Sequence, residues 1–128
     1  MGVPIRAVLP LLNLAAIISH LPLERLQLVK RITTYISLVQ FTDKGIHAAK
    51  ETTQRVAEWA TKVQSKGVTV KQMYWTLGHY DQVCIFEAPN DETAASVLLS
   101  ADMLGNIRTQ TLRAFTSVEM EKILANVP

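Results

Sequence analysis

The sequence lacks the features that mark several specialised protein classes. It holds a single cysteine, Cys84, which excludes an intramolecular disulfide framework and a multi-cysteine metal site. Cys84 lies in an apolar strand-like run, which indicates a buried, inert thiol, and a lone free thiol fits the reducing cytoplasm. The 13 Lys and Arg residues are scattered among 11 Asp and Glu, so no basic stripe predicts nucleic-acid binding.

Motifs for catalysis and metal binding are also missing. The sequence has no Gly-rich phosphate loop, no G-x-S-x-G and no zinc motif. The histidines at positions 20, 47 and 79 lie far apart and show no metal-ligand spacing. We therefore expect neither a metal nor a cofactor.

Residues 1–31 differ in composition from the rest of the chain. The run 8–23 is nearly all apolar, but Pro10 and Pro22 interrupt it, and it is shorter than the ~20 residues of a membrane span. No clear signal-peptide cleavage site follows, so membrane association is not expected. Three interpretations stay open: a helix packed on the domain, a disordered translation-start artefact, or a weak membrane-surface or export signal.

From Thr33 onward, hydrophobic periodicity predicts alternating strands and helices. Runs of β-branched and apolar residues predict strands over 34–41, 68–77, 82–88 and 107–115. Helical spacing predicts a helix over 45–65 that ends at Gly67, a second between Asn90 and Gly105, and a last one capped by Ser117. The first helix is expected to pack through Val56, Ala60 and Val63, together with Thr53 and Ala57.

This order, β-α-β-β-α-β plus a C-terminal helix, predicts an α+β fold of the ferredoxin-like type. Right-handed crossovers give a four-stranded antiparallel sheet with helices on one face and strands 34–41 and 82–88 at its centre. Residues 32–128 would form this domain, and residues 1–31 an N-terminal extension.

Several stretches of the domain resemble the GYD-domain family of small bacterial and archaeal proteins, and they occur in the family's order. They are 35–38 with 41–46, then 74–81, 87–92 and 104–115, and the Gly-x-Tyr-Asp turn of the family name matches Gly78, Tyr80 and Asp81. The resemblance implies a dimeric α/β-barrel type of ferredoxin-like fold. It does not imply that the protein catalyses any particular reaction. Members of this kind begin just before the first strand, which favours the start-site interpretation of residues 1–31.

The central strands carry apolar side chains on both faces of the expected sheet. One set is Ile36, Leu38, Val83 and Ile85, and the other is Tyr35, Val39, Phe41, Cys84 and Phe86. Helices cover only one face, so the remaining set would expose a few hundred Å² of apolar surface. We therefore predict a homo-oligomer that pairs its sheets face to face, with two-fold symmetry the simplest case. The alternative cover is the Leu-rich segment 8–30.

The densest group of functional side chains is Trp75, His79, Tyr80 and Asp81. His79 beside a carboxylate is a candidate catalytic base. Neighbours in a hairpin usually point apart, however, which favours a structural interpretation in which Gly78 turns the chain, Asp81 accepts turn amides and Tyr80 packs.

Alternation along the last strand places Thr109, Thr111 and Arg113 on one face and Arg108 and Gln110 on the other. Arg113 could hold a carboxylate or another anion, although a solvated edge strand explains the same pattern. Trp75, Tyr80 and Arg113 are the predicted ligand-binding residues of a pocket between the sheet and a partner subunit.

Three functions fit the sequence. The first is an oligomeric small-molecule-binding or regulatory module. The second is a cofactor-independent oxygenase or isomerase, by analogy with similar dimeric α/β-barrel proteins. The third is a structural subunit that contacts another protein. An enclosed pocket that holds a titratable group with a shifted pKa would favour the enzyme. A pocket without such a group would favour the binding module, and an exposed apolar patch would favour the interaction protein.

Overall fold

The computed structural model describes residues 32–128, and the predicted extension over residues 1–31 lies outside this part of the chain. The strands are β1 (Thr33–Phe41), β2 (Thr69–Trp75), β3 (Gln82–Ala88) and β4 (Ile107–Ala114). The helices are α3 (Asp43–His47), α4 (Thr52–Val63), α5 (Asp91–Asp102) and α6 (Ser117–Ala125), with single 3-10 turns η1 (Ala49–Glu51) and η2 (Gln64–Lys66). None of these helices combines the length and the hydropathy that crossing a membrane requires.

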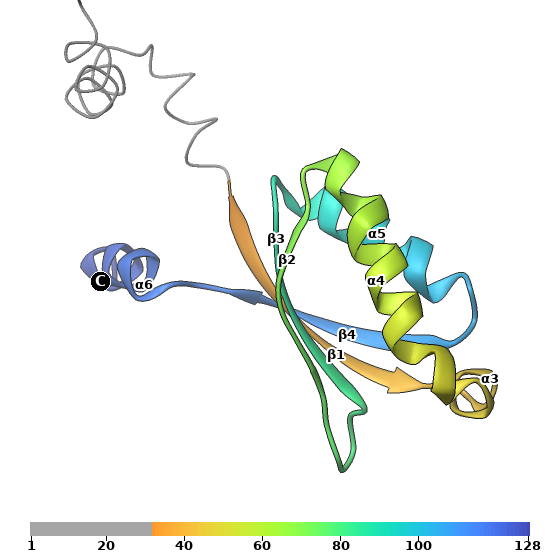
Figure 1. The fold of residues 1–128 in the computed structure, drawn as a ribbon. Coiled ribbons are helices and arrows are strands. Elements are labelled where there is room, and N and C mark those ends of the chain that lie inside the picture. Colours follow the sequence, from red (N-terminus) through yellow and green to blue (C-terminus); the bar gives the residue numbers. More distant parts are fainter. Residues whose placement is uncertain (1–31) are drawn as a thin grey trace, which may run out of the picture. The chain divides into compact units, whose positions relative to one another are not determined.

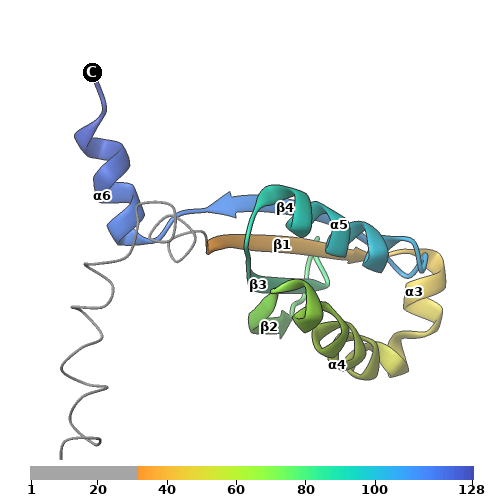
Figure 2. The same ribbon diagram turned by 90° about the horizontal axis from the view of Figure 1, so that it is seen from above.

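The strands form one antiparallel sheet in the order β2-β3-β1-β4, with β1 and β3 at its centre. Helices α4 and α5 lie on the same face of this sheet (Figure 1). The predicted ferredoxin-like α+β fold is therefore confirmed. Helix α6 follows the end of β4 and stands beyond the sheet, away from α4 and α5 (Figure 2).

The first helical region differs from the single helix predicted over 45–65. Thr42 caps the short helix α3 by accepting a hydrogen bond from the Gly45 amide at 3.1 Å. The chain then leaves helical geometry at Ala48, with φ −103° and ψ 27°, before α4 begins. This break shifts the buried stripe of α4, so that Thr53 and Ala57 are exposed and Arg55 faces inward instead.

Cap residues explain where the other helices begin and end. Asn90 caps α5 through a hydrogen bond from the Thr93 amide at 2.8 Å. Gly67 ends η2 in the left-handed region at φ 77°, as predicted. The prediction that Ser117 caps the last helix is wrong, because Thr116 forms a capping box with Glu119. Strand β2 ends before the fully exposed Leu77.

The core lies between the central strands and helices α4 and α5. Phe86 is fully buried, stacks on Tyr35 with ring centroids 5.2 Å apart, and meets Trp59 edge-on at 6.3 Å. Cys84 is buried beside it, and burial raises the pKa of its thiol to about 12, so the thiolate is scarce at neutral pH. The predicted division of the central strands into a core-facing set and an opposite set is confirmed.

Gly45 packs directly against the start of β4, and replacing it is expected to destabilise the domain. A Cβ at this position would lie 1.9 Å from the backbone oxygen of Asn106, which itself accepts a hydrogen bond from the Thr42 amide at 3.0 Å. Gly45→Ala should therefore lower the free energy of unfolding by about 1–3 kcal/mol, although alanine is ordinarily the better helix residue by ~1 kcal/mol. Urea denaturation measures this, and a stabilised variant would contradict the packing.

Candidate functional site

The face of the sheet opposite α4 and α5 carries a continuous apolar surface, called here the open face. Its centre is the row Ile85, Ile36 and Leu112, which lie opposite one another on β3, β1 and β4. The next row adds Leu38, Val83 and Tyr74. Tyr74 is 54% exposed and Leu112 is 44% exposed. No helix of residues 32–128 covers this face (Figure 1).

Polar side chains surround this apolar centre. Gln72, Gln110 and Arg108 share the open face through their pairing with Ile85, Leu38 and Gln40. Lys71 and Glu87 form an ion pair of 3.6 Å at the β2 side. An apolar centre within a polar rim is the usual anatomy of a protein–protein interface.

Helix α6 adds a second unpartnered apolar surface. None of its residues is buried, and its exposed apolar side chains, with those that flank it, are Phe115, Val118, Met120, Ile123, Leu124 and Val127. The helix is well formed, because the capping box satisfies its first amides. A stable helix held away from its own sheet can reach a neighbouring molecule.

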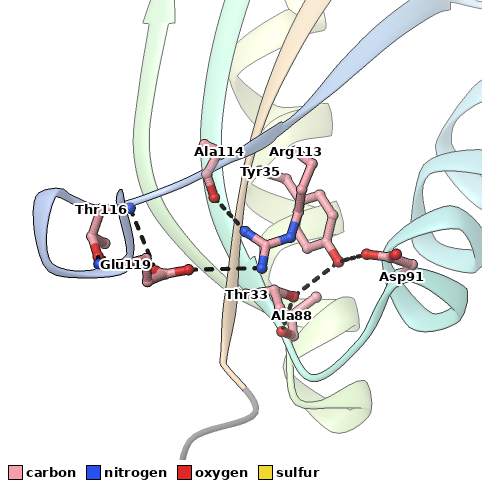
Figure 3. Close-up of polar contacts among 8 residues, drawn as sticks. All are labelled: Thr33, Tyr35, Ala88, Asp91, Arg113, Ala114, Thr116 and Glu119. Atoms are coloured by element: carbon pink, nitrogen blue, oxygen red, sulfur yellow. Dashed lines mark hydrogen bonds and ion pairs between the residues drawn. The ribbon is translucent and has the colours of Figure 1, made fainter. Parts of the chain in front are cut away.

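Arg113 anchors the start of α6 to the sheet (Figure 3). Its guanidinium donates a hydrogen bond to the Ala114 carbonyl and lies 3.7 Å from a carboxylate oxygen of Glu119. It also stacks over Phe115 at 4.7 Å and lies 5.8 Å from the centre of the Tyr35 ring. These contacts lie within the chain, so Arg113 is engaged without an external anion.

The hydroxyl of Tyr35 joins this end of the sheet to α5. It donates to the Asp91 carboxylate and lies 2.9 Å from Thr33 Oγ1, which donates to the Ala88 carbonyl at 2.8 Å (Figure 3). Burial raises the pKa of the Tyr35 hydroxyl, and the hydrogen bond to Asp91 raises it further. The phenol therefore remains a hydrogen-bond donor at neutral pH.

The Gly-x-Tyr-Asp turn fastens the β2–β3 hairpin to β1. Asp81 accepts a hydrogen bond from the Phe41 amide at 2.7 Å, and its own amide donates to the Val39 carbonyl at 2.8 Å. The predicted acceptor role of Asp81 in the turn is filled by its backbone carbonyl, which accepts from the Thr76 amide at 2.9 Å, whereas its carboxylate accepts from another strand. Gly78 has φ 102°, which suits glycine at the tip of the turn.

Removing the Asp81 carboxylate is expected to loosen this hairpin. Asp81→Ala leaves the partly buried Phe41 amide without its acceptor, and we expect the free energy of unfolding to fall by about 1–3 kcal/mol. Asp81→Asn keeps an acceptor oxygen, so its free energy of unfolding should fall by less than that of Asp81→Ala. Asp43→Ala removes an exposed carboxylate from the first turn of α3 and serves as the control, with an expected loss of at most ~1 kcal/mol. Equal losses in all three variants would contradict the role of Asp81.

The side chains singled out from the sequence do not meet in one pocket of a single chain. Trp75 points to the helix side, where its Nε1 donates to Thr52 Oγ1 at 3.1 Å. The Tyr80 hydroxyl donates to Gln110 on the open face at 2.8 Å, and Arg113 lies at the opposite end of the sheet. His79 is exposed beside Tyr80, with ring centroids 4.9 Å apart.

Comparison with known proteins agrees with the motif and the fold. The family model for the GYD domain matches residues 35–124. A protein of Thermus thermophilus, described as glutamine synthetase and cystathionine beta-lyase binding protein, is 31% identical over 88 residues. That alignment spans 68% of this chain and 93% of the relative. The chain therefore belongs to the GYD-domain family.

Proposed function

We propose that this protein is a non-catalytic binding module that assembles with copies of itself through the open face. The observation that carries the proposal is the continuous apolar surface on the central strands, formed by Ile36, Leu38, Val83, Ile85, Leu112 and Tyr74. An uncovered surface of this kind on a protein in water usually marks an interaction site.

A second copy of the chain is the proposed occupant of this face. Two identical sheets can bury their open faces about a two-fold axis, because each surface is then its own complement. Burying ~400 Å² of apolar surface at about 25 cal/mol per Å² contributes on the order of 10 kcal/mol, before the cost of association. The apolar side of α6 would extend this interface, since it stands beyond its own sheet.

Other proteins are the proposed partners of the assembled module. The Thermus thermophilus relative is described as binding glutamine synthetase and cystathionine beta-lyase, so these two enzymes are the first partners to test. We place the protein in the cytoplasm, on the basis of its unpaired cysteine. We also treat residues 1–31 as an extension of the 32–128 domain, since the family match begins at residue 35.

The partner proposal is tested by titrating the full chain with each of the two purified enzymes, taken from the organism that encodes this chain. Biolayer interferometry with immobilised full chain should show saturable binding to at least one enzyme, and an unrelated enzyme of similar charge should show none. Binding to neither enzyme would contradict the proposed partners.

The enzyme hypothesis finds no comparable support in the structure. It requires a titratable group that can exchange a proton near neutral pH inside a pocket, and its candidate base His79 is exposed on the β2–β3 turn. Cys84 lines the space between the sheet and helices α4 and α5, but burial raises the pKa of its thiol to about 12, which disfavours the reactive thiolate. The ring of His79 contacts Tyr80, and its backbone carbonyl accepts from Gln40 at 3.0 Å. The interaction surface therefore supports the proposed function better than the exposed His79 supports catalysis.

A further inference from the structure

A cavity of about 80 Å³ lies on the helix side of the sheet, between the central strands and helices α4 and α5. One water molecule needs roughly 10–15 Å³ measured this way, so the cavity is large enough for a small organic molecule. The sheet separates it from the open face, so a role for the cavity is independent of the proposed assembly.

Most of the cavity wall is apolar. The side chains that form it include Val56, Trp59, Met73, Leu98, Leu104 and Ile107. Protein interiors are normally packed without spaces of this size, because wall atoms that face a void lose their dispersion contacts. A bound molecule with an aromatic or aliphatic body would restore those contacts.

The wall offers no accessible charge to a ligand. Among residues 32–128, Arg55 is the only charged residue that lines the cavity; its Nη1 donates to the Ala48 carbonyl at 2.6 Å, and its Nη2 is fully enclosed by protein. The Cys84 thiol also lines the cavity, and its raised pKa keeps it neutral. A charged group in the cavity would lose its hydration without gaining a partner, so the wall favours a neutral ligand.

Most polar groups of the wall already have partners within the chain. The Thr52 hydroxyl accepts a hydrogen bond from the Trp75 indole N–H at 3.1 Å. The Ser37 hydroxyl accepts one from Thr111 at 3.0 Å. These groups therefore need no ligand to satisfy them.

Gln82 is the buried exception. Its side chain is 3% exposed, and its Nε2 donates to Thr52 Oγ1 at 2.9 Å, which fixes the amide group beneath α4. The other end of the amide, Oε1, accepts no hydrogen bond from residues 32–128. In this part of the chain, Arg55 Nη2 is the only side-chain polar atom that is both fully enclosed and unpaired, so Gln82 Oε1 retains accessible surface.

That accessible surface of Gln82 faces the cavity, because the side chain borders the cavity and is buried on its other sides. An amide oxygen in apolar surroundings is costly without a donor. A ligand that brings one hydrogen-bond donor and an apolar body would satisfy the oxygen and fill the space around it.

We infer that this cavity binds a small neutral molecule that carries a hydroxyl group on an aromatic or branched aliphatic body. The hydroxyl donates to Gln82 Oε1, and the body packs between Trp59 and Leu98. A few placed polar groups in a mostly apolar wall are the usual composition of a small-molecule site.

Isothermal titration calorimetry of the full chain with phenol, toluene and benzoate tests this inference. Toluene has a methyl group in place of the hydroxyl of phenol, and benzoate is charged at neutral pH. We expect saturable binding of phenol at millimolar concentration or below, and at least ~10-fold weaker binding of benzoate, because its carboxylate would be buried without a partner. No binding of phenol, or equal binding of phenol and benzoate, would overturn the inference.

Gln82→Met tests the hydrogen bond, because it removes the amide oxygen and keeps an unbranched side chain of similar length. We expect phenol binding to weaken at least ~5-fold, since the hydroxyl would then be buried without an acceptor. Toluene needs no acceptor and should bind this variant at least as tightly as the unaltered chain. Thr52 keeps its hydrogen bond from Trp75. Phenol binding that is unchanged, or that weakens together with toluene binding, would contradict the role of Oε1.

Two further variants locate the binding in the cavity. Ala101→Leu should weaken both phenol and toluene, because Ala101 lines the cavity and a larger side chain would fill part of it. Gln64→Met is the matched control, since Gln64 is exposed in η2 and should leave both affinities unchanged. Unchanged circular dichroism shows that each variant keeps the fold. Phenol binding that survives both Gln82→Met and Ala101→Leu would place the ligand elsewhere and contradict the site.

Discussion

Leu112→Glu is expected to convert the proposed homo-oligomer into monomers without unfolding the domain. Leu112 lies opposite Ile36 on the open face and is 44% exposed in the single chain, so a carboxylate there remains solvated in the monomer. In a face-to-face pair, two copies of the new charge would be buried among apolar side chains without partners. We expect the dissociation constant of the pair to rise at least ~100-fold, which corresponds to about 3 kcal/mol.

The matched control for this substitution is Leu99→Glu. Leu99 is 61% exposed on α5, on the side of the domain that the proposed assembly leaves free. Size-exclusion chromatography with light scattering should give the oligomer mass for Leu99→Glu and the monomer mass for Leu112→Glu, with unchanged circular dichroism in both. An unchanged mass for Leu112→Glu would show that the open face is not the subunit contact.

Phe86→Ala is expected to cause the largest loss of stability of any single truncation proposed for this chain. Phe86 is 0% exposed, and its ring lies between those of Tyr35 and Trp59, at centroid distances of 5.2 and 6.3 Å. Its removal loses both aromatic contacts and enlarges the space between sheet and helices. Truncation of a buried phenylalanine lowers the free energy of unfolding by about 3–5 kcal/mol. This loss is a large part of the roughly 5–15 kcal/mol that is the free energy of unfolding of a typical domain.

Urea denaturation at a fixed protein concentration measures this loss, because assembly contributes to the apparent stability of an oligomer. Leu99→Ala is the control, since Leu99 is 61% exposed on α5, on the side of the domain that the proposed assembly leaves free. Its expected loss is below about 1 kcal/mol. A loss of the same size for both variants would show that Phe86 does not occupy the centre of the core.

The alternation of side chains made the sheet predictable from the sequence. A period of two assigns Tyr35, Val39, Cys84 and Phe86 to one face, and all four are buried in the central strands. The opposite set, with Ile36 among its members, then had to form the open face. Strand order and pairing followed from short connections and right-handed crossovers.

Features that depend on contacts between distant segments could not be predicted in this way. Nothing local marks the break at Ala48, which depends on how α3 packs against the start of β4, and the break changes which side of α4 faces inward. The helical spacing of Thr52, Arg55, Val56 and Trp59 could have placed Arg55 on the inward side of α4. The partner of Asp81 lies forty positions away in β1, beyond the reach of turn patterns.

The subunit count of the domain without its N-terminal extension tests the central claim most directly. Sedimentation equilibrium of the full chain and of residues 33–128 distinguishes two ways of covering the open face. One is pairing with a second copy of the chain, and the other is packing of segment 8–30. If the open face pairs with itself, both chains will sediment as the same dimer or higher multiple at micromolar concentration. A monomer for residues 33–128 would contradict the proposed assembly.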